Sequence, residues 1–135
     1  MIFNKYEKVL LVAPSNFSVQ LLVSDKLIKH ITSVDRVFPA IYEMAPNIII
    51  FDYDYLSDDV EKILRRIRSN SFYNKIKIYC LKNTADTKTD ELLKTLGVNH
   101  VIFKNELQKQ KKGGLNQVKL IFDSAFNDLL VNASA

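Results

Sequence analysis

The sequence predicts an α/β protein in which five strands, each followed by a helix, form one parallel sheet. Short apolar runs rich in β-branched and aromatic residues recur along the chain and are bounded by polar or turn residues, as buried strands are. Between these runs, apolar residues recur at helical spacing. Right-handed crossovers place helices on both faces of such a doubly wound (βα)5 sheet, for which 2-1-3-4-5 is the expected strand order.

Four of the five expected strands are apolar on both faces, which is typical of strands inside a parallel sheet. They span Lys8–Pro14, Asn47–Asp52, Ile76–Leu81 and Val98–Lys104. A weaker strand is expected over Thr32–Phe38, between the first two of these runs. Ligands of such sheets bind at the carboxyl ends of the strands, near the switch between the first and third strands, so we expect any chemistry at that edge.

The clearest helix is expected shortly after Asp52. Four apolar residues recur there at i, i+3, i+4 and i+7, and charged residues fill the other face of the helix. Asp58 or Asp59 is the expected N-cap. The four apolar residues are Val60, Ile63, Leu64 and Ile67.

Weaker patterns predict the other four helices. The first follows Ser15 or Asn16 as its cap, and the second is a short helix over Ala40–Ala45. The fourth ends at Gly97, and the last begins after Gly114 with a wide apolar face that must pack on the sheet or on another subunit. The apolar residues are Phe17, Leu21, Leu22 and Ile28 in the first helix, Leu92, Leu93 and Leu96 in the fourth, and Leu115, Val118, Ile121, Phe122, Ala125, Phe126, Leu129 and Leu130 in the last.

Length and composition indicate one soluble domain spanning residues 1–135. Hydrophobic residues make up 47% of the chain and charged residues 25%, which is the balance of an ordinary globular protein. No apolar run is long enough to span a bilayer, and the N-terminus does not read as a signal peptide, so we expect a cytoplasmic protein that does not bind membranes. The single cysteine, Cys80, cannot form an internal disulfide and is expected to be a small buried hydrophobe.

The net charge of +4 is concentrated in one stretch, because lysines gather without any acid between Leu107 and Phe122. These are Lys109, Lys111, Lys112 and Lys119. A nucleic-acid site needs a broader basic surface with base-stacking aromatic residues, so we expect a solvated face and no nucleic-acid partner. The two histidines, His30 and His100, lack neighbours at metal-ligand spacing and are expected to be structural.

Three stretches resemble the receiver domains of bacterial response regulators, whose fold is the CheY-like, or flavodoxin-like, form of this architecture. PNIIIFD, which ends at Asp52, resembles the family's third strand, whose last Asp accepts a phosphoryl group. The stretch DYDYLSDDVEKILRRIR then matches the family's loop and helix without a gap, at positions that include Asp59 and Arg68. GVNHVIFK resembles the fifth strand and its switch lysine, which places Lys104 at the family's usual separation from Asp52.

The departures from the family pattern concern phosphorylation. Receivers place two adjacent acids after the first strand to hold Mg²⁺, whereas VLLVAPS has Ala13 and Pro14 at these positions. Neither side chain can ligate a metal, and phosphoryl transfer relies on Mg²⁺ to neutralise developing charge. The Ser or Thr that ends the family's fourth strand falls on Lys82. We therefore expect no cofactor, with Mg²⁺ required only if Asp54 or a backbone carbonyl replaces the missing acids.

Lys82 has two interpretations. If Lys82 and Lys104 both point at Asp52, two ammonium groups supply the charge that the metal normally supplies, and Asp52 is held ionised in a permanent ion pair. Alternatively, Lys82 is a solvent-exposed residue at a strand end, because long lysine side chains readily reach water. The sequence favours neither.

The resemblance and its departures together imply a pseudo-receiver in a bacterial two-component or phosphorelay pathway. Such a domain signals without phosphorylation, as a protein-interaction module and not as an enzyme. The chain ends soon after the last helical pattern, so we expect its output to come from contact with a protein partner, or from a homodimer formed through the last helix.

Two alternatives stay open. One is a conventional receiver that a histidine kinase phosphorylates on Asp52. The other is a doubly wound domain that binds a small ligand. Against the second, the turn after the first strand, APSNFS, lacks the glycines that let a backbone approach a phosphate.

Overall fold

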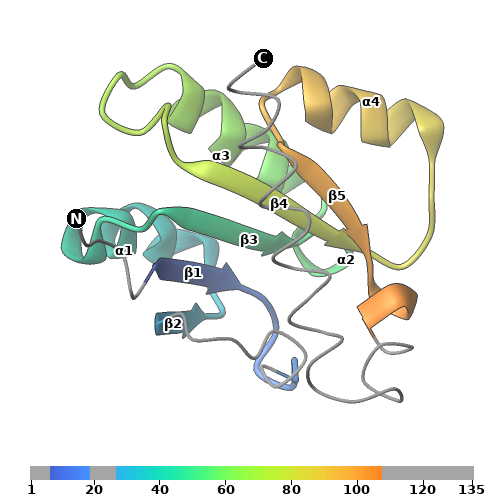
Figure 1. Cartoon of the computed structure of the whole chain (residues 1–135), viewed down its shortest axis with the longest axis horizontal. Coiled ribbons are helices and arrows are strands. Elements are labelled where there is room, and N and C mark those ends of the chain that lie inside the picture. Colours follow the sequence, from blue (N-terminus) through green and yellow to red (C-terminus); the bar gives the residue numbers. More distant parts are fainter. Residues whose placement is uncertain (1–6, 19–26, 108–135) are drawn as a thin grey trace, which may run out of the picture.

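The computed structural model describes residues 7–18 and 27–107. Five parallel strands form one sheet in the order β2-β1-β3-β4-β5, so the predicted fold class and strand order are confirmed (Figure 1). The strands are β1 (Lys8–Val12), β2 (Leu27–Ile31), β3 (Ile48–Asp52), β4 (Lys77–Lys82) and β5 (His100–Phe103). The helical elements are η2 (Val34–Arg36), α1 (Val37–Met44), α2 (Tyr53–Leu56), α3 (Asp58–Arg68) and α4 (Thr87–Thr95), and residues 104–107 are also helical.

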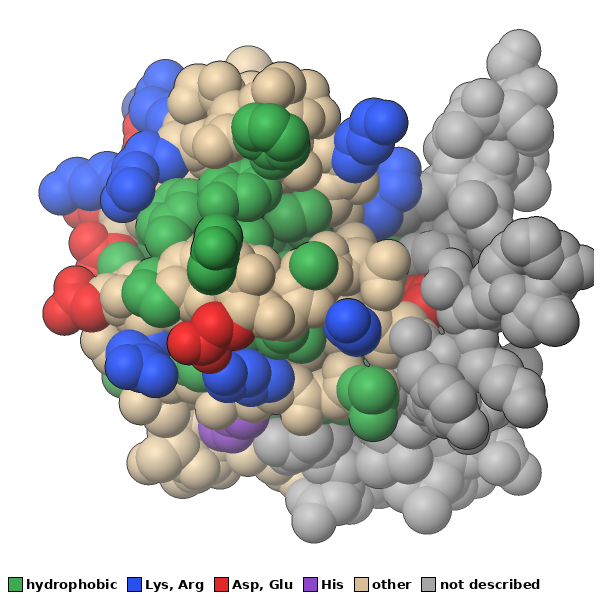
Figure 2. Space-filling view, turned by 90° about the vertical axis from the view of Figure 1, so that its left-hand side faces the viewer, with side chains coloured by type: hydrophobic (Ala, Val, Ile, Leu, Met, Phe, Trp, Pro, Cys, Tyr) green, Lys and Arg blue, Asp and Glu red, His purple; other side chains and the backbone are tan. Residues whose placement is uncertain are grey.

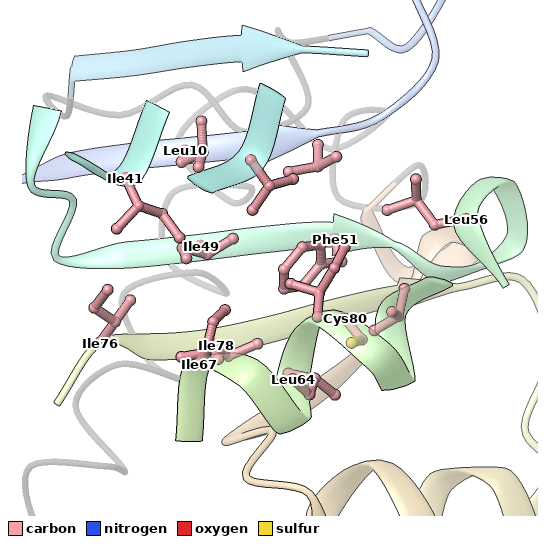
Figure 3. Packing of buried hydrophobic residues seen from close by; sticks show 14 of the residues in the cluster. Leu10, Ile41, Ile49, Phe51, Leu56, Leu64, Ile67, Ile76, Ile78 and Cys80 are labelled. Carbon is pink, nitrogen blue, oxygen red and sulfur yellow. The ribbon is translucent and has the colours of Figure 1, made fainter. Parts of the chain in front are cut away.

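Helices α1, α3 and α4 contribute buried residues to one hydrophobic cluster with one face of the sheet. The four predicted apolar residues of α3 are buried, and Leu64 and Ile67 lie beside Phe51, Ile78 and Cys80 of the sheet (Figure 3). Alternate strand residues form a second cluster on the opposite face. The first and last predicted helices lie mostly in residues 19–26 and 108–135, outside the described residues.

The predicted position of the second strand is wrong. β2 precedes Thr32–Phe38, and that stretch instead contains η2 and the start of α1. The Ser33 hydroxyl accepts a hydrogen bond from the Asp35 N–H (3.2 Å) and caps η2, and the apolar residues that follow recur at helical spacing and are buried. Ile28, predicted in the first helix, belongs to β2.

Two predicted helix starts also shift. The N-cap of α3 is Ser57, and Asp58 and Asp59 lie in the first turn, where negative charge is favoured by the helix dipole. α1 begins earlier than predicted, at Val37, because Pro39 is compatible with a first helical turn. None of the helices in the described ranges is long and apolar enough to cross a membrane.

Candidate functional site

The carboxyl edge of the sheet brings Asp52 and Lys104 together. Asp52 is the last residue of β3, and Lys104 follows β5, two strands away. The Lys104 Nζ lies 2.8 Å from Asp52 Oδ1, within hydrogen-bond and ion-pair distance. The side chain of Asp52 is only 2% exposed and that of Lys104 is 19% exposed, so this is a largely buried pair.

Asp54 is a third member of this cluster, and the sequence did not reveal its orientation. Its Oδ2 lies 3.1 Å from Lys104 Nζ and accepts a hydrogen bond from the backbone N–H of Asn83 (2.8 Å). Lys104 therefore bridges two carboxylates, one buried and one about one-third exposed. We call Asp52, Asp54 and Lys104 the Lys104 cluster.

Asp52 also shapes the chain that follows it. Its Oδ1 accepts a hydrogen bond from the Tyr55 N–H (3.3 Å) and so caps α2. The Tyr55 hydroxyl then donates to the Thr32 carbonyl (2.9 Å), just past the end of β2. Because β1 lies between β2 and β3 in the sheet, this link passes across the carboxyl end of β1.

Lys82 lies on the opposite face of the sheet from Asp52. Leu81 is the β4 residue in register with Asp52, and strand side chains alternate between faces, so the next residue, Lys82, points the other way. There its Nζ lies 2.5 Å from Asp90 Oδ1 on α4 and 5.4 Å from the centre of the Tyr53 ring. The side chain of Lys82 is 5% exposed.

Neither interpretation of Lys82 therefore holds. The hypothesis that both lysines contact Asp52 is correct for Lys104 and wrong for Lys82, because strand alternation separates Lys82 from that carboxylate. The alternative of a solvent-exposed Lys82 is also wrong, because Asp90 pairs with the buried ammonium. We call these two residues the Lys82–Asp90 pair.

The end of β1 is apolar where the family pattern has its acids. Ala13 is fully buried; its N–H donates to the Ile31 carbonyl (3.1 Å), and its own carbonyl lies 3.0 Å from His30 Nε2. Pro14 follows it, and neither residue has a side-chain oxygen.

The residues present do not fit a Mg²⁺ ion. Such an ion needs hard oxygen ligands, but Ala13 and Pro14 supply none from their side chains, and the two carboxylates here already share the ammonium of Lys104. Within residues 7–18 and 27–107, no three His, Cys, Asp or Glu side chains gather closely enough to hold a metal.

No protein-family model and no curated protein matches the sequence. Solved structures with similar folds include several response regulators. The response regulator from Hahella chejuensis has 12% identity, with 88% of this chain and 94% of that chain covered and a TM-score of 0.71. The phosphorylated cyanobacterial phytochrome response regulator RcpA has 19% identity, coverage of 86% and 91%, and a TM-score of 0.67. The chemotaxis response regulator CheY4 of Vibrio cholerae has 17% identity, coverage of 79% and 97%, and a TM-score of 0.63.

At these identities the likeness establishes a shared fold. The chain has the architecture of a receiver domain along nearly the full length of these structures. The positions singled out in the sequence lie at the carboxyl edge of that sheet, with Asp52 and Lys104 in contact and Lys82 turned to the other face.

Proposed function

We propose that this chain is a receiver-like signalling domain that acts through protein contacts and does not accept a phosphoryl group on Asp52. The observation that carries the proposal is the Lys104 ammonium, which bridges the buried Asp52 and Asp54 at the edge where β1 supplies Ala13 and Pro14 instead of acids. In this account the lysine, and not a metal, compensates the charge of Asp52.

Electrostatics disfavours phosphorylation of such a site. A phosphoryl donor brings further negative charge to the acceptor carboxylate, and Mg²⁺ normally neutralises that charge during transfer. The single positive charge of Lys104 is already shared between two carboxylates, and the carboxylate of Asp52 also accepts the Tyr55 N–H. Asp52 is therefore a structural anion that holds β3, β5 and α2 together.

The output that remains is contact with another protein. The pseudo-receiver account places the chain in the cytoplasm, in a bacterial two-component or phosphorelay pathway, with no catalytic residue of its own. A homodimer through the last predicted helix, which lies outside the described residues, stays part of this proposal.

Titration with Mg²⁺, followed by amide NMR, tests the metal-free site. We expect the amide signals of Ala13, Asp52 and Asn83 to stay unmoved up to millimolar Mg²⁺, because Ala13 and Pro14 offer no side-chain oxygen and the two nearby carboxylates already pair with Lys104. The matched control is the double variant Ala13→Asp, Pro14→Asp, which restores the acids and should shift the same signals in a saturable way. A saturable shift in the unaltered protein contradicts the proposal.

One observation favours the second candidate, a conventional receiver phosphorylated on Asp52 by a histidine kinase. Asp54 turns toward the same ammonium as Asp52, so a second carboxylate does reach this edge. In that account Asp54 replaces a missing metal ligand once Lys104 moves. The variant Asp54→Asn separates the two accounts, because it abolishes Mg²⁺ binding and phosphorylation in the conventional account and changes neither in ours.

A further inference from the structure

An apolar hollow of about 450 Å³ opens at the edge of the sheet opposite the Lys104 cluster. It lies between α1, which leads into β3, and the turn over residues 69–76, which leads into β4. Figure 2 looks onto this end of the molecule and shows hydrophobic side chains gathered there. Its main lining residues are Ile41, Tyr42, Pro46, Phe72, Tyr73 and Ile76, which we call the apolar groove.

Two aromatic side chains project into solvent from the groove. Tyr42 is 84% exposed and Phe72 is 87% exposed, more than any other large hydrophobic residue among those described. Single exposed apolar residues are ordinary, but two aromatic residues beside one apolar hollow are typical of a protein contact site. Aromatic side chains of this kind supply much of the binding energy in protein interfaces.

The turn that carries Phe72 is held in place by hydrogen bonds. The Asn70 Oδ1 accepts from the Phe72 N–H (2.8 Å). The Arg68 guanidinium donates to the carbonyls of Asn74 (2.6 Å) and Ile76 (3.1 Å), and also to that of Gly97. A partner that binds a fixed turn does not have to order it first, which preserves affinity.

Most charged residues around the groove are cations. Two further hollows adjoin the groove at Phe72, and across the linings of all three the charged residues are the cations Arg66, Lys75 and Lys77. Glu43, the residue after Tyr42 on α1, is paired with Lys29 at 3.4 Å. The rim of the groove is therefore positively charged and complements an anionic partner.

We propose that the apolar groove docks an acidic segment of a partner protein, with one large apolar side chain of that segment seated between Tyr42 and Phe72. An apolar centre with a charged rim is the usual composition of a protein interface. A second copy of this chain fits the surface poorly, because a two-fold interface would set the cationic rim against itself.

This inference deepens the proposed function and rests on it in one respect, namely that the output is a protein contact. The groove and the Lys104 cluster lie at opposite ends of the strands. Docking is therefore expected to be the same whether or not Asp52 carries its charge.

Selection from a random short-peptide library displayed on phage, with the whole protein as bait, tests the proposal. We expect enriched peptides in which an aromatic residue or leucine is flanked by Asp and Glu. A synthetic, fluorescently labelled copy of the most enriched peptide should then lose affinity by about tenfold or more in Phe72→Ser and in the double variant Lys75→Glu, Lys77→Glu. Circular dichroism verifies that each variant is folded.

Three matched controls alter similar residues elsewhere and should leave peptide affinity unchanged. They are Leu27→Ser, an exposed hydrophobic residue on β2, Lys88→Glu, an exposed cation on α4, and Asp52→Asn. The absence of enrichment, enrichment of neutral or basic peptides, or binding that is insensitive to the groove variants overturns the proposal. So does a dimer in analytical ultracentrifugation that Phe72→Ser dissociates, because the occupant is then a second copy.

The outcomes also separate this inference from the proposed function. If no acidic peptide binds at the apolar groove, the proposal that Lys104 and not a metal balances the charge of Asp52 is unaffected. Phosphorylation of Asp52 would overturn that account and leave peptide docking at the groove unaffected.

Discussion

Lys82 ends β4 and Lys104 follows the neighbouring strand β5 at the same edge of the sheet, yet the two lysines meet different acids on different sides of it. Lys104 bridges Asp52 and Asp54 and has some access to water, whereas the more deeply buried Lys82 pairs with Asp90 on α4. The difference arises from strand alternation, since Leu81, and not Lys82, is in register with Asp52. Two residues that look equivalent in the sequence therefore perform different structural tasks.

The comparison also shows how each pair stabilises the fold. The Lys104 cluster joins β3 to the chain after β5 and contains two anions for one cation, so the loss of either carboxylate leaves Lys104 with an ionic partner. In the Lys82–Asp90 pair, the loss of the acid leaves a buried ammonium without its ionic partner. The second arrangement should be far more sensitive to mutation.

The largest effect is expected for Asp90→Asn. The change leaves Lys82 buried with no acid among its described contacts, and the free energy of unfolding should fall by about 3 kcal/mol. Urea denaturation of the variant and of the unaltered protein measures this difference in the free energy of unfolding. The double variant Lys82→Met, Asp90→Leu removes both charges and should recover most of the lost stability, because an apolar pair replaces an ion pair at little net cost. A double variant as unstable as Asp90→Asn would contradict this account of Lys82.

A smaller loss, about 1 to 2 kcal/mol, is expected for Lys104→Met. The buried Asp52 then loses its cation but keeps the hydrogen bond from the Tyr55 N–H, and Asp54 is exposed enough to be solvated by water. Urea denaturation under the same conditions gives the value. A loss of unfolding free energy as large as that of Asp90→Asn would contradict the expectation that the Lys82–Asp90 pair is the more sensitive of the two to mutation.

The stability of the protein should depend on pH through the thiol of Cys80, which lies on β4 two residues before Lys82. Burial raises the pKa of its thiol from 9.0 to about 12. The protonated thiol therefore contributes stability that is fully present below about pH 9 and is lost as pH rises toward about 12. Between about pH 8.5 and pH 10 this loss should reach about 1 kcal/mol.

Comparison with Cys80→Ala isolates this contribution from other alkaline titrations, since that variant should show a correspondingly weaker loss over the same range. The thiol also reports on its neighbourhood. Alkylation of Cys80 should accelerate in Asp90→Asn and stay closer to the original rate in Asp52→Asn. Equal acceleration in both variants would show that the two ion pairs do not act on separate sides of the sheet.

The smallest effect is expected for Asp54→Asn. Asp54 is about one-third exposed, so its ion pair with Lys104 is screened by solvent, and the loss should stay below about 0.5 kcal/mol. An asparagine oxygen can still accept the Asn83 N–H. Chemical denaturation measured alongside Lys104→Met provides the comparison, and a loss near that of Lys104→Met would make Asp54 the main partner of the lysine.

The fold was readable from the sequence where burial dominates. β1, β3, β4 and α3 have continuous or helically spaced apolar residues, and the three strands lie inside their predicted runs or extend one residue beyond them. β2 is different, because it lies at the edge of the sheet and only Ile31 of its five residues is buried. Its sequence, LIKHI, therefore carried a weak strand signal.

The site was predictable only in part. The positions of Asp52 and Lys104 at strand ends follow from the lengths of the apolar runs, but their contact was only one of the two possibilities that the sequence left open. The orientation of Asp54 depends on α2, a short helix that no periodicity indicates. Asp90 did carry a signal, since it precedes the buried Leu93 by three residues and so lies on the inner face of α4.

The central claim is that Asp52 is a structural anion held by Lys104. Intact-mass spectrometry after incubation with acetyl phosphate and Mg²⁺ tests it most directly, with peptide mapping to locate any modification. The account predicts no phosphoryl mass on the unaltered protein, because Ala13 and Pro14 supply no ligand for a metal that would balance the charge of the donor, and Lys104 is already shared between two carboxylates. A phosphoryl group located on Asp52 would contradict the account.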